Sequence, residues 1–220
     1  MMVLFEYPHK AAFGRIIPKN KIYDHTGASS SVKNLFVRQV DRIIWKYKLA
    51  PETINIPATK SIPEVQIFEV SLKEQDFKFE VLQEIDKAIA FPIIFELVFA
   101  DKIKIVAGYK RPNEADSTKW VVSDYFSSQW LPNNQARKSL PVALNLGGLY
   151  EQLLLPLMPY KPRDKEKLKD QVARIGLVFA KQKELAKLEV KLAKEKQFNR
   201  KVEINGEIRI TKQKIEKLIK

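Results

Sequence analysis

Carboxylates close to predicted strands are the residues of this sequence best suited to hold a metal ion. A Mg²⁺-dependent nuclease needs clustered acids on adjacent strands to bind the ion, and a lysine to stabilise developing negative charge. The candidates for such a site are Glu64, Glu69, Asp76, Lys78 and Glu96. These acids lack the ordered spacing that a strand hairpin would need, and Asp-x-Lys triplets are frequent in a charged chain. A nuclease with Mg²⁺ as its cofactor is therefore an alternative hypothesis, and solvated or paired strand residues are the simpler interpretation.

An aromatic residue beside two cations ends the predicted strand over 103–109. Tyr109, Lys110 and Arg111 combine a ring that can stack on a base with charges that can neutralise a phosphate. In the simpler interpretation, which we rank higher, the ring fills the core and the cations end the strand. The trio is a candidate nucleic-acid contact.

Basic residues near the C-terminus recur at helical spacing. Lys187, Lys191 and Lys194 fall on one face of a helix, and Arg200 or Lys201 can extend this face. Such a face could contact the phosphates of DNA or RNA. The solvated flank of a coiled coil has the same pattern, so both interpretations stay open.

Composition excludes several kinds of site. The 220 residues include no cysteine, so a disulfide, a thiolate zinc site and a cysteine nucleophile are all ruled out. His9 and His25 lack paired metal-binding spacing, and the seven glycines form neither a phosphate loop nor a dinucleotide motif. Serine hydrolase signatures are also missing. The sequence contains no recognisable catalytic constellation, and no cofactor is expected outside the nuclease alternative.

The net charge of +13 favours an acidic partner such as nucleic acid or an acidic protein face. The N-terminal residues lack the basic region and the long apolar stretch of a secretory signal. No run approaches the roughly 18 apolar residues of a membrane span. We therefore expect a cytoplasmic protein without a membrane partner.

The elements that must position these residues are those of an α+β domain. Alternating or continuous apolar runs predict strands, and apolar residues at 3-and-4 spacing predict helices. Strands are predicted over 65–72, 91–99, 103–109 and 119–126, and helices over 32–48, 79–89 and 140–158, the last with a kink at its two glycines. The short connection at 100–102 predicts a hairpin. Together these elements predict a mixed, mainly antiparallel sheet of about four strands with covering helices.

The composition changes after Pro162. Residues 161–220 contain 19 Lys and Arg against 9 Asp and Glu, a net charge of +10, which leaves only +3 for the first 160 residues. Leucines and other apolar residues at 3-and-4 spacing predict a long, coiled-coil-like helix, and Asn205-Gly206 predicts the turn of a helical hairpin. The predicted domains are a globular α+β domain over 1–160 and a basic helical tail over 161–220.

Three groups of segments resemble a known family. They are residues 49–57 (LAPETINIP), residues 85–89 (IDKAI) together with 95–97 (FEL) and 108–110 (GYK), and residues 195–203 (EKQFNRKVE). Together they resemble a bacterial and archaeal domain family of unknown function, whose genes often lie beside DNA methyltransferase and helicase-type restriction genes. The chain departs from the family pattern at Ala90, where a proline is expected. The resemblance implies a role in or near a restriction or phage-defence system, with methyltransferase or helicase proteins as partners.

The leading hypothesis is a non-enzymatic accessory protein of such a system. Its basic helical tail is expected to bind DNA or RNA, a partner protein, or both, and the apolar stripe of the tail could also support a homo-oligomer. A Mg²⁺-dependent nuclease and a purely structural protein-protein adaptor are the alternatives.

Overall fold

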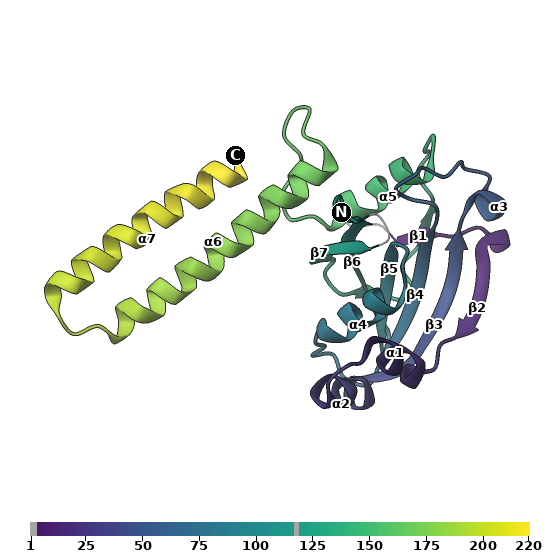
Figure 1. Ribbon diagram of the computed structural model, residues 1–220, viewed down its shortest axis with the longest axis horizontal. Coiled ribbons are helices and arrows are strands. Elements are labelled where there is room, and N and C mark those ends of the chain that lie inside the picture. The colour runs from purple at the N-terminus through teal and green to yellow at the C-terminus, as the bar shows by residue number, and fades with distance from the viewer. Residues whose placement is uncertain (1–3, 117–118) are drawn as a thin grey trace. The chain divides into compact units, whose positions relative to one another are not determined.

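The chain forms two compact units, Met1–Met158 and Pro159–Lys220. The computed structural model describes residues 4–116 and 119–220. Figure 1 shows a twisted sheet with short helices in the first unit and two long helices in the second. Each unit is described by itself below.

A seven-stranded, mostly antiparallel sheet is the centre of the first unit. The strands follow the order β2-β3-β4-β5-β6-β7, and β8 pairs with β6. Their bounds are β2 (Ala12–Ile16), β3 (Val40–Leu49), β4 (Val65–Leu72), β5 (Ile93–Phe99), β6 (Lys102–Pro112), β7 (Trp120–Ser127) and β8 (Leu131–Pro132). Among the described strands of this sheet, only β4 and β5 are parallel neighbours, and the helix α4 (Glu80–Ala88) makes the crossover between them. The mixed, mainly antiparallel α+β class is confirmed, but the sheet has more strands than the sequence predicts.

The predicted hairpin over 91–99 and 103–109 is present as β5 and β6, which pair antiparallel from Phe99 opposite Lys102. The predicted helix over 32–48 is wrong in its second half. The helix α2 (Ser30–Gln39) begins at the Ser29 N-cap and ends where β3 starts. The β-branched and aromatic residues of β3 favour a strand, and pairing with both β2 and β4 outweighs their helical spacing.

One face of the sheet carries the main core. The helices α1 (Lys19–Thr26), α2 and α4 cover this face. The fully buried core side chains include Phe36 from α2, Phe68 from β4, Ile85 from α4 and Phe95 from β5. Alternate strand residues point to opposite faces, so Glu69 and Glu96 lie on the other face.

The other elements of the first unit are short. They are β1 (Leu4–Glu6) and β9 (Arg137–Ser139), which form a separate parallel pair, η1 (His9–Ala11), α3 (Pro51–Ile54), α5 (Leu146–Leu154) and η2 (Leu155–Leu157). The helix predicted over 140–158 is therefore shorter than expected. Asn145 caps α5 by accepting a hydrogen bond from the Gly148 N–H at 2.9 Å. The two glycines thus lie in the first turn of α5 rather than at a kink.

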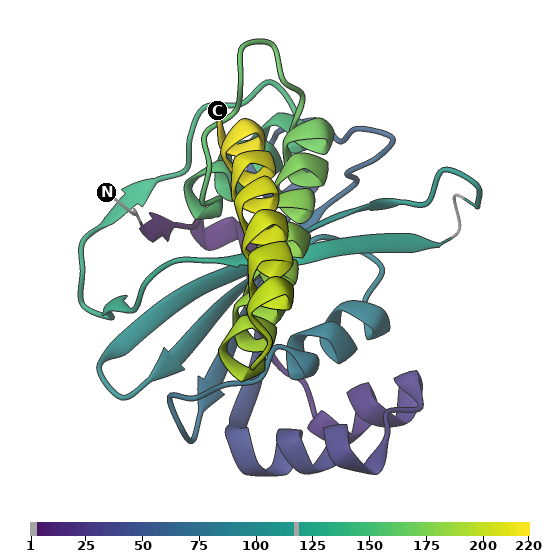
Figure 2. The ribbon, with the colours of Figure 1, turned by 90° about the vertical axis from the view of Figure 1, so that its left-hand side faces the viewer.

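Two antiparallel helices form most of the second unit. They are α6 (Leu168–Lys194) and α7 (Phe198–Ile219), and Figure 2 shows them side by side. Arg174 near the start of α6 donates a hydrogen bond to the Leu218 carbonyl near the end of α7 at 3.0 Å. The buried side chains of α7 are Ile204, Ile208, Thr211 and Ile215, at the 3-and-4 spacing of one helix face.

The turn between these helices lies at 195–197, and the turn predicted at Asn205-Gly206 is wrong. Helix α7 continues through both residues because Ile204 and Ile208 on either side are buried. A lone glycine costs a helix only about 1 kcal/mol, which such burial offsets. None of the described helices combines the length and the apolar character that crossing a bilayer requires.

Candidate functional site

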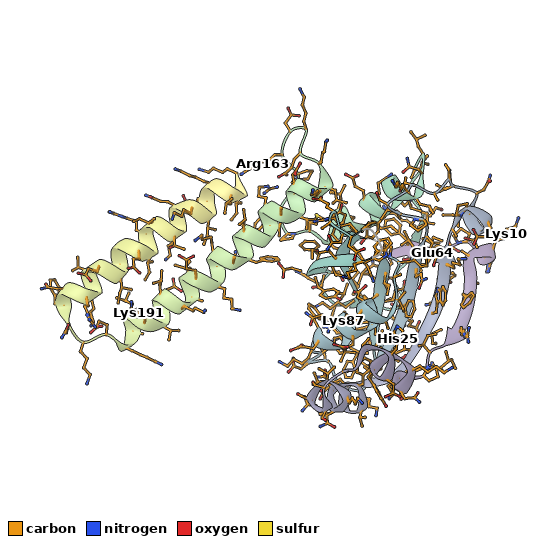
Figure 3. All side chains as sticks on the ribbon, viewed as in Figure 1. Lys10, His25, Glu64, Lys87, Arg163 and Lys191 are labelled. Carbon is orange, nitrogen blue, oxygen red and sulfur yellow. The ribbon has the colours of Figure 1, made fainter. Side chains whose placement is uncertain are left out.

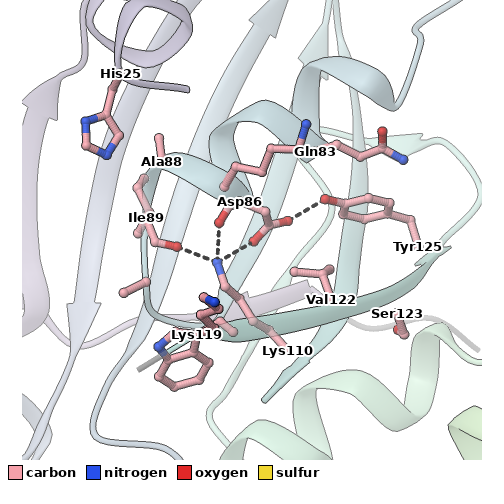
Figure 4. Close-up of a pocket in the computed structure, with 13 residues that line it drawn as sticks. His25, Gln83, Asp86, Ala88, Ile89, Lys110, Lys119, Val122, Ser123 and Tyr125 are labelled. Carbon is pink, nitrogen blue, oxygen red and sulfur yellow. Dashed lines mark hydrogen bonds and ion pairs between the residues drawn. The ribbon is translucent and has the colours of Figure 1, made fainter. Parts of the chain in front are cut away.

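A pocket of about 670 Å³ lies between the C-terminal end of α4 and the strands β6 and β7. Its lining comes from four places in the chain: His25 of α1, the end of α4 with residues 88–90, Lys110 of β6, and the start of β7, where Lys119, Trp120, Val122, Ser123 and Tyr125 line it. Figure 4 shows Lys110 directed toward Asp86 and Ile89, and Tyr125 directed toward the Asp86 carboxylate from the other side.

A buried hydrogen-bond network forms one wall of this pocket. Lys110 Nζ donates to the backbone carbonyls of Asp86, at 2.6 Å, and of Ile89, and it lies 3.2 Å from Asp86 Oδ1. The Tyr125 hydroxyl donates to Asp86 Oδ2. The side chains of Lys110 and Asp86 are only 1% and 4% exposed. Because Lys110 uses all three ammonium hydrogens internally, the network fixes the end of α4 rather than binding a ligand.

Burial dominates the electrostatics of these groups. It raises the pKa of the Asp86 carboxyl and lowers the pKa of the Lys110 ammonium, while the attraction between the two groups opposes both shifts. Burial and the neighbouring Asp86 also raise the pKa of the Tyr125 hydroxyl far above its ordinary value. Tyr125 therefore stays protonated and acts as a hydrogen-bond donor.

A second pocket of about 350 Å³ adjoins the first, since both are lined by His25 and by residues 88–90. Its walls are mainly apolar and include the rings of Trp45, Phe68 and Phe91. Gln66 also lines it and is 2% exposed. We call the two adjoining pockets the aromatic groove.

The prediction that Lys110 contacts a phosphate does not fit the position of its side chain. Its ammonium is buried and fully hydrogen-bonded, so it cannot neutralise a phosphate at the surface. Tyr109 is half-buried and stacks on Tyr150, with ring centroids 6.3 Å apart. Arg111 is also half-buried, and its guanidinium lies 3.5 Å from the Glu114 carboxylate. The three neighbouring residues therefore do not form one exposed surface.

Two of the predicted nuclease acids do come together. Glu69 and Glu96 lie opposite each other on the parallel strands β4 and β5. Lys46 Nζ lies 2.8 Å from Glu69 and 3.1 Å from Glu96, and Arg137 binds the other oxygen of Glu96 at 2.7 Å. The two cations thus neutralise the pair from both sides, which is a structural role for these carboxylates.

The remaining predicted acids lie elsewhere. Glu64 accepts a hydrogen bond from Gln66 and lies 3.4 Å from Lys48 Nζ. Asp76 and Lys78 lie before α4, where the Gln39 side chain bonds to their backbone groups. Within the described residues, no three His, Cys, Asp or Glu side chains are placed to hold a metal ion. The five residues of the nuclease alternative therefore do not form one site.

The predicted basic residues of the second unit surround the turn between α6 and α7. Figure 3 labels Lys191 near this turn. These five residues are all exposed: Lys187, Lys191, Lys194, Arg200 and Lys201. We call them the basic hairpin cluster. Their side chains have no hydrogen bond or ion pair with any other described residue.

The cluster is positioned by the two helices. Lys187, Lys191 and Lys194 follow i, i+4, i+7 spacing on α6, so they share one face, while Leu188 and Leu192 are partly buried. Arg200 and Lys201 lie in the first turn of α7. Within the turn, backbone N–H groups of Gln197 and Lys196 hold the pKa of the Glu195 carboxyl below its ordinary value, and Arg200 and Lys191 add to this effect.

Sequence reasoning missed the residues of the aromatic groove. Asp86, Tyr125 and Gln66 come from separate elements and belong to no sequence motif. The one local signal was aromatic content around Trp120, which lies near the candidate trio in the sequence. Only the β4–α4–β5 crossover and the β6–β7 pairing bring these residues together.

Comparison with protein families gives a match over most of the chain. A family model described as a domain of unknown function (DUF4391) matches residues 5–215. A search of curated proteins finds no match, and a search of solved structures finds none either.

Proposed function

Because the chain belongs to the DUF4391 family, a domain family of unknown function, we propose a function from its own residues: it binds nucleic acid through the basic hairpin cluster. In this proposal the protein is a non-enzymatic accessory factor. The finer part of the proposal is a role beside DNA methyltransferase or helicase proteins in a restriction-type or phage-defence system.

The observation that carries the proposal is that no described residue forms a hydrogen bond or ion pair with the five side chains of the cluster. The Glu195 carboxyl, whose pKa is lowered mainly by backbone N–H groups, lies near enough to Arg200 and Lys191 for them to lower this pKa further. Elsewhere in the described chain many cations are paired, as Lys46 is with Glu69 and Arg174 with Glu166. The five side chains of the cluster are exposed without such a partner. Unpaired lysines and arginines on one surface attract phosphates, and their binding releases the counterions of the nucleic acid.

The charge distribution supports the same surface. The second unit contains most of the net charge of the protein, +10 of +13. One turn of an α-helix separates Lys187 from Lys191, about 6 Å along the axis, so the charges are dense enough to contact successive phosphates.

A protein-binding adaptor is the second candidate. Five large apolar side chains of the two helices are at least half exposed: Leu177 (56%), Val190 (55%), Phe198 (77%), Val202 (56%) and Ile210 (50%). Such residues can pack against a partner helix or a second copy of the chain. Light scattering would test whether two copies of the chain associate, and a strictly monomeric protein would exclude this association.

The experiment that tests the proposal is an electrophoretic shift of the full chain on duplex and single-stranded DNA and RNA. It is done with and without Mg²⁺, at low and physiological salt. Binding without cleavage supports the proposal. Cleavage that requires Mg²⁺ would instead identify a nuclease. The absence of a shift on all of these nucleic acids would favour the protein-binding adaptor.

A matched pair of variants separates the cluster from overall charge. The test variant is K187Q/K191Q/K194Q. The control variant K10Q/K60Q/K138Q removes the same charge from exposed positions of the first unit. We expect the shift to weaken in the test variant and to persist in the control.

A further inference from the structure

Phe198 is the most exposed aromatic side chain of the residues that the structure describes, with 77% of its surface accessible. It is the first residue of α7 and directly follows the turn at 195–197. No ring contact with another described residue involves it. The other exposed phenylalanine, Phe13, packs against Trp45 with ring centroids 4.1 Å apart. Packing within the described chain therefore does not account for the Phe198 ring.

Cations surround this ring along the chain. Residues 191–201, which enclose the turn, contain five Lys or Arg and one Glu, a net charge of +4. Three of the cations, Lys194, Lys196 and Arg200, lie within four positions of Phe198 and are exposed. Proteins that bind single strands combine an accessible ring, on which a base stacks, with cations that contact the phosphates on either side. Both parts are present at this turn.

Hydrogen bonds hold the turn that presents the ring. The Glu195 carboxylate accepts from the backbone N–H groups of Lys196, at 2.8 Å, and Gln197, at 2.9 Å. The Lys201 N–H donates to the Gln197 carbonyl at 3.0 Å in the first turn of α7. An ordered turn lowers the entropy cost of binding. The one acid between the cations is thus engaged with the backbone of the turn.

An apolar partner fits this surface less well. Along α7, Val202 is the only other large apolar side chain exposed within one turn of Phe198, about 6 Å along the axis. Protein and membrane docking surfaces are usually contiguous apolar patches of a few hundred Å². A second copy of the chain would bring together two units that each have a net charge of +10. The observations therefore favour a ligand that is both aromatic and anionic.

We propose that the basic hairpin cluster binds single-stranded nucleic acid in preference to duplex, with Phe198 stacked on an unpaired base. This inference rests on the proposed function, because the cluster supplies the phosphate contacts. In a duplex the bases are stacked on one another and closed to the ring, so only the phosphate contacts remain. Single-stranded DNA and RNA present the same base faces and phosphates.

The test is fluorescence anisotropy of the full chain with a labelled pyrimidine-rich single strand and with a duplex of the same length. The single strand is used as DNA and as RNA, and the tighter of the two identifies the preferred sugar. Phe198→Ala should weaken single-strand binding about 5- to 150-fold, the contribution of one stacked base. Duplex binding should change less than about twofold, since it depends on phosphate contacts.

Two further variants separate stacking from apolar contact. Phe198→Leu keeps an apolar side chain without an aromatic face, so it should weaken single-strand binding as Phe198→Ala does. Phe198→Trp keeps a stacking face and should retain the affinity of the parent. Phe13→Ala is the matched control, because it removes an exposed ring from the first unit and should change neither affinity. Circular dichroism of each variant confirms that it folds.

The proposal is overturned if folded Phe198→Ala binds the single strand as the parent does, or if it loses duplex binding to the same extent. Parent-like binding by Phe198→Leu would also overturn it, because it would identify an apolar contact. A lower mass of Phe198→Ala in light scattering would assign the ring to a second copy of the chain. Failure of the proposed function looks different: the parent would then bind neither the single strand nor the duplex.

Discussion

The ammonium of Lys110 lies 3.2 Å from a carboxylate oxygen of Asp86, and both side chains are almost completely removed from solvent. The two residues are 24 positions apart, on β6 and α4. Their interaction ties the end of α4 to the sheet beside the aromatic groove. It also makes each residue dependent on the other, since a buried charge without its partner is strongly unfavourable.

Replacing one partner should therefore destabilise the first unit. We expect Lys110→Met to lower the free energy of unfolding by about 3–5 kcal/mol, measured by urea denaturation. Lys119→Met is the control, because its exposed pair with Asp116 should contribute less than about 1 kcal/mol. A loss below about 1 kcal/mol in Lys110→Met would contradict a structural role for the pair.

The same variant should gain a pH dependence. Burial already raises the pKa of Asp86, and Lys110 is the main group that opposes this shift. Without Lys110 the folded-state pKa rises further above the unfolded one, so the protonated carboxyl stabilises the fold at low pH. Stability of Lys110→Met should then fall as the pH rises through that pKa, in denaturation curves compared between pH 5 and pH 8. A loss of stability that is equal at both pH values would rule this out.

Replacing glycine by alanine should have opposite effects on stability at two positions. A Cβ on Gly108 would lie 2.6 Å from Val122 Cγ1 and 3.3 Å from the Ser123 carbonyl oxygen, so Gly108→Ala should cost about 1–3 kcal/mol. A Cβ on Gly206 would meet nothing within 4 Å inside α7, so Gly206→Ala should stabilise the helix by about 1 kcal/mol. Thermal unfolding measures both. A destabilised Gly206→Ala would indicate that the chain turns there after all.

The second unit should loosen in acid. The Glu166 carboxylate accepts two hydrogen bonds from Arg174, each 2.7 Å, and these hold the pKa of Glu166 at about 2, below the ordinary value of 4.5. A lowered folded-state pKa stabilises the fold above the unfolded pKa, and this contribution disappears as the pH falls from about 4.5 toward 2. NMR titration of the Glu166 carboxyl gives the pKa directly. In Glu166→Gln the acid-dependent part should vanish, and a midpoint near 4.5 in the parent protein would show that the pair does not form.

Short-range patterns in the sequence were enough to predict several of the strands. The alternation over 65–72 coincides with β4, and the hairpin of β5 and β6 follows from two apolar runs with a short connection. The predicted helix at 32–48 failed at Val40, because pairing with β4 is a long-range interaction that spacing cannot reveal. The turn at 195–197 was missed because it contains neither glycine nor proline, and the Asn205-Gly206 pair is a stronger turn signal.

The candidate sites also differ in whether short-range sequence patterns can identify their residues. Helical spacing was enough to group Lys187, Lys191 and Lys194, since one helix positions all three. Strand alternation places the neighbours Tyr109 and Lys110 on opposite faces, but no pattern along the chain reveals that the Lys110 ammonium is buried against Asp86. The groove needs Gln66, Phe91 and Trp120 from three different elements or loops, so no pattern along the chain could find it.

The salt dependence of nucleic-acid binding tests the central claim most directly. Fluorescence anisotropy gives the association constant of the full chain for a labelled duplex over a range of salt concentrations. Each phosphate contact adds about 0.9 to the slope of log K against log salt. We predict a steep negative slope for the parent and for K10Q/K60Q/K138Q, and a slope smaller in magnitude by about 2–3 for K187Q/K191Q/K194Q. An unchanged slope in K187Q/K191Q/K194Q, or no binding by the parent at low salt, would contradict the account.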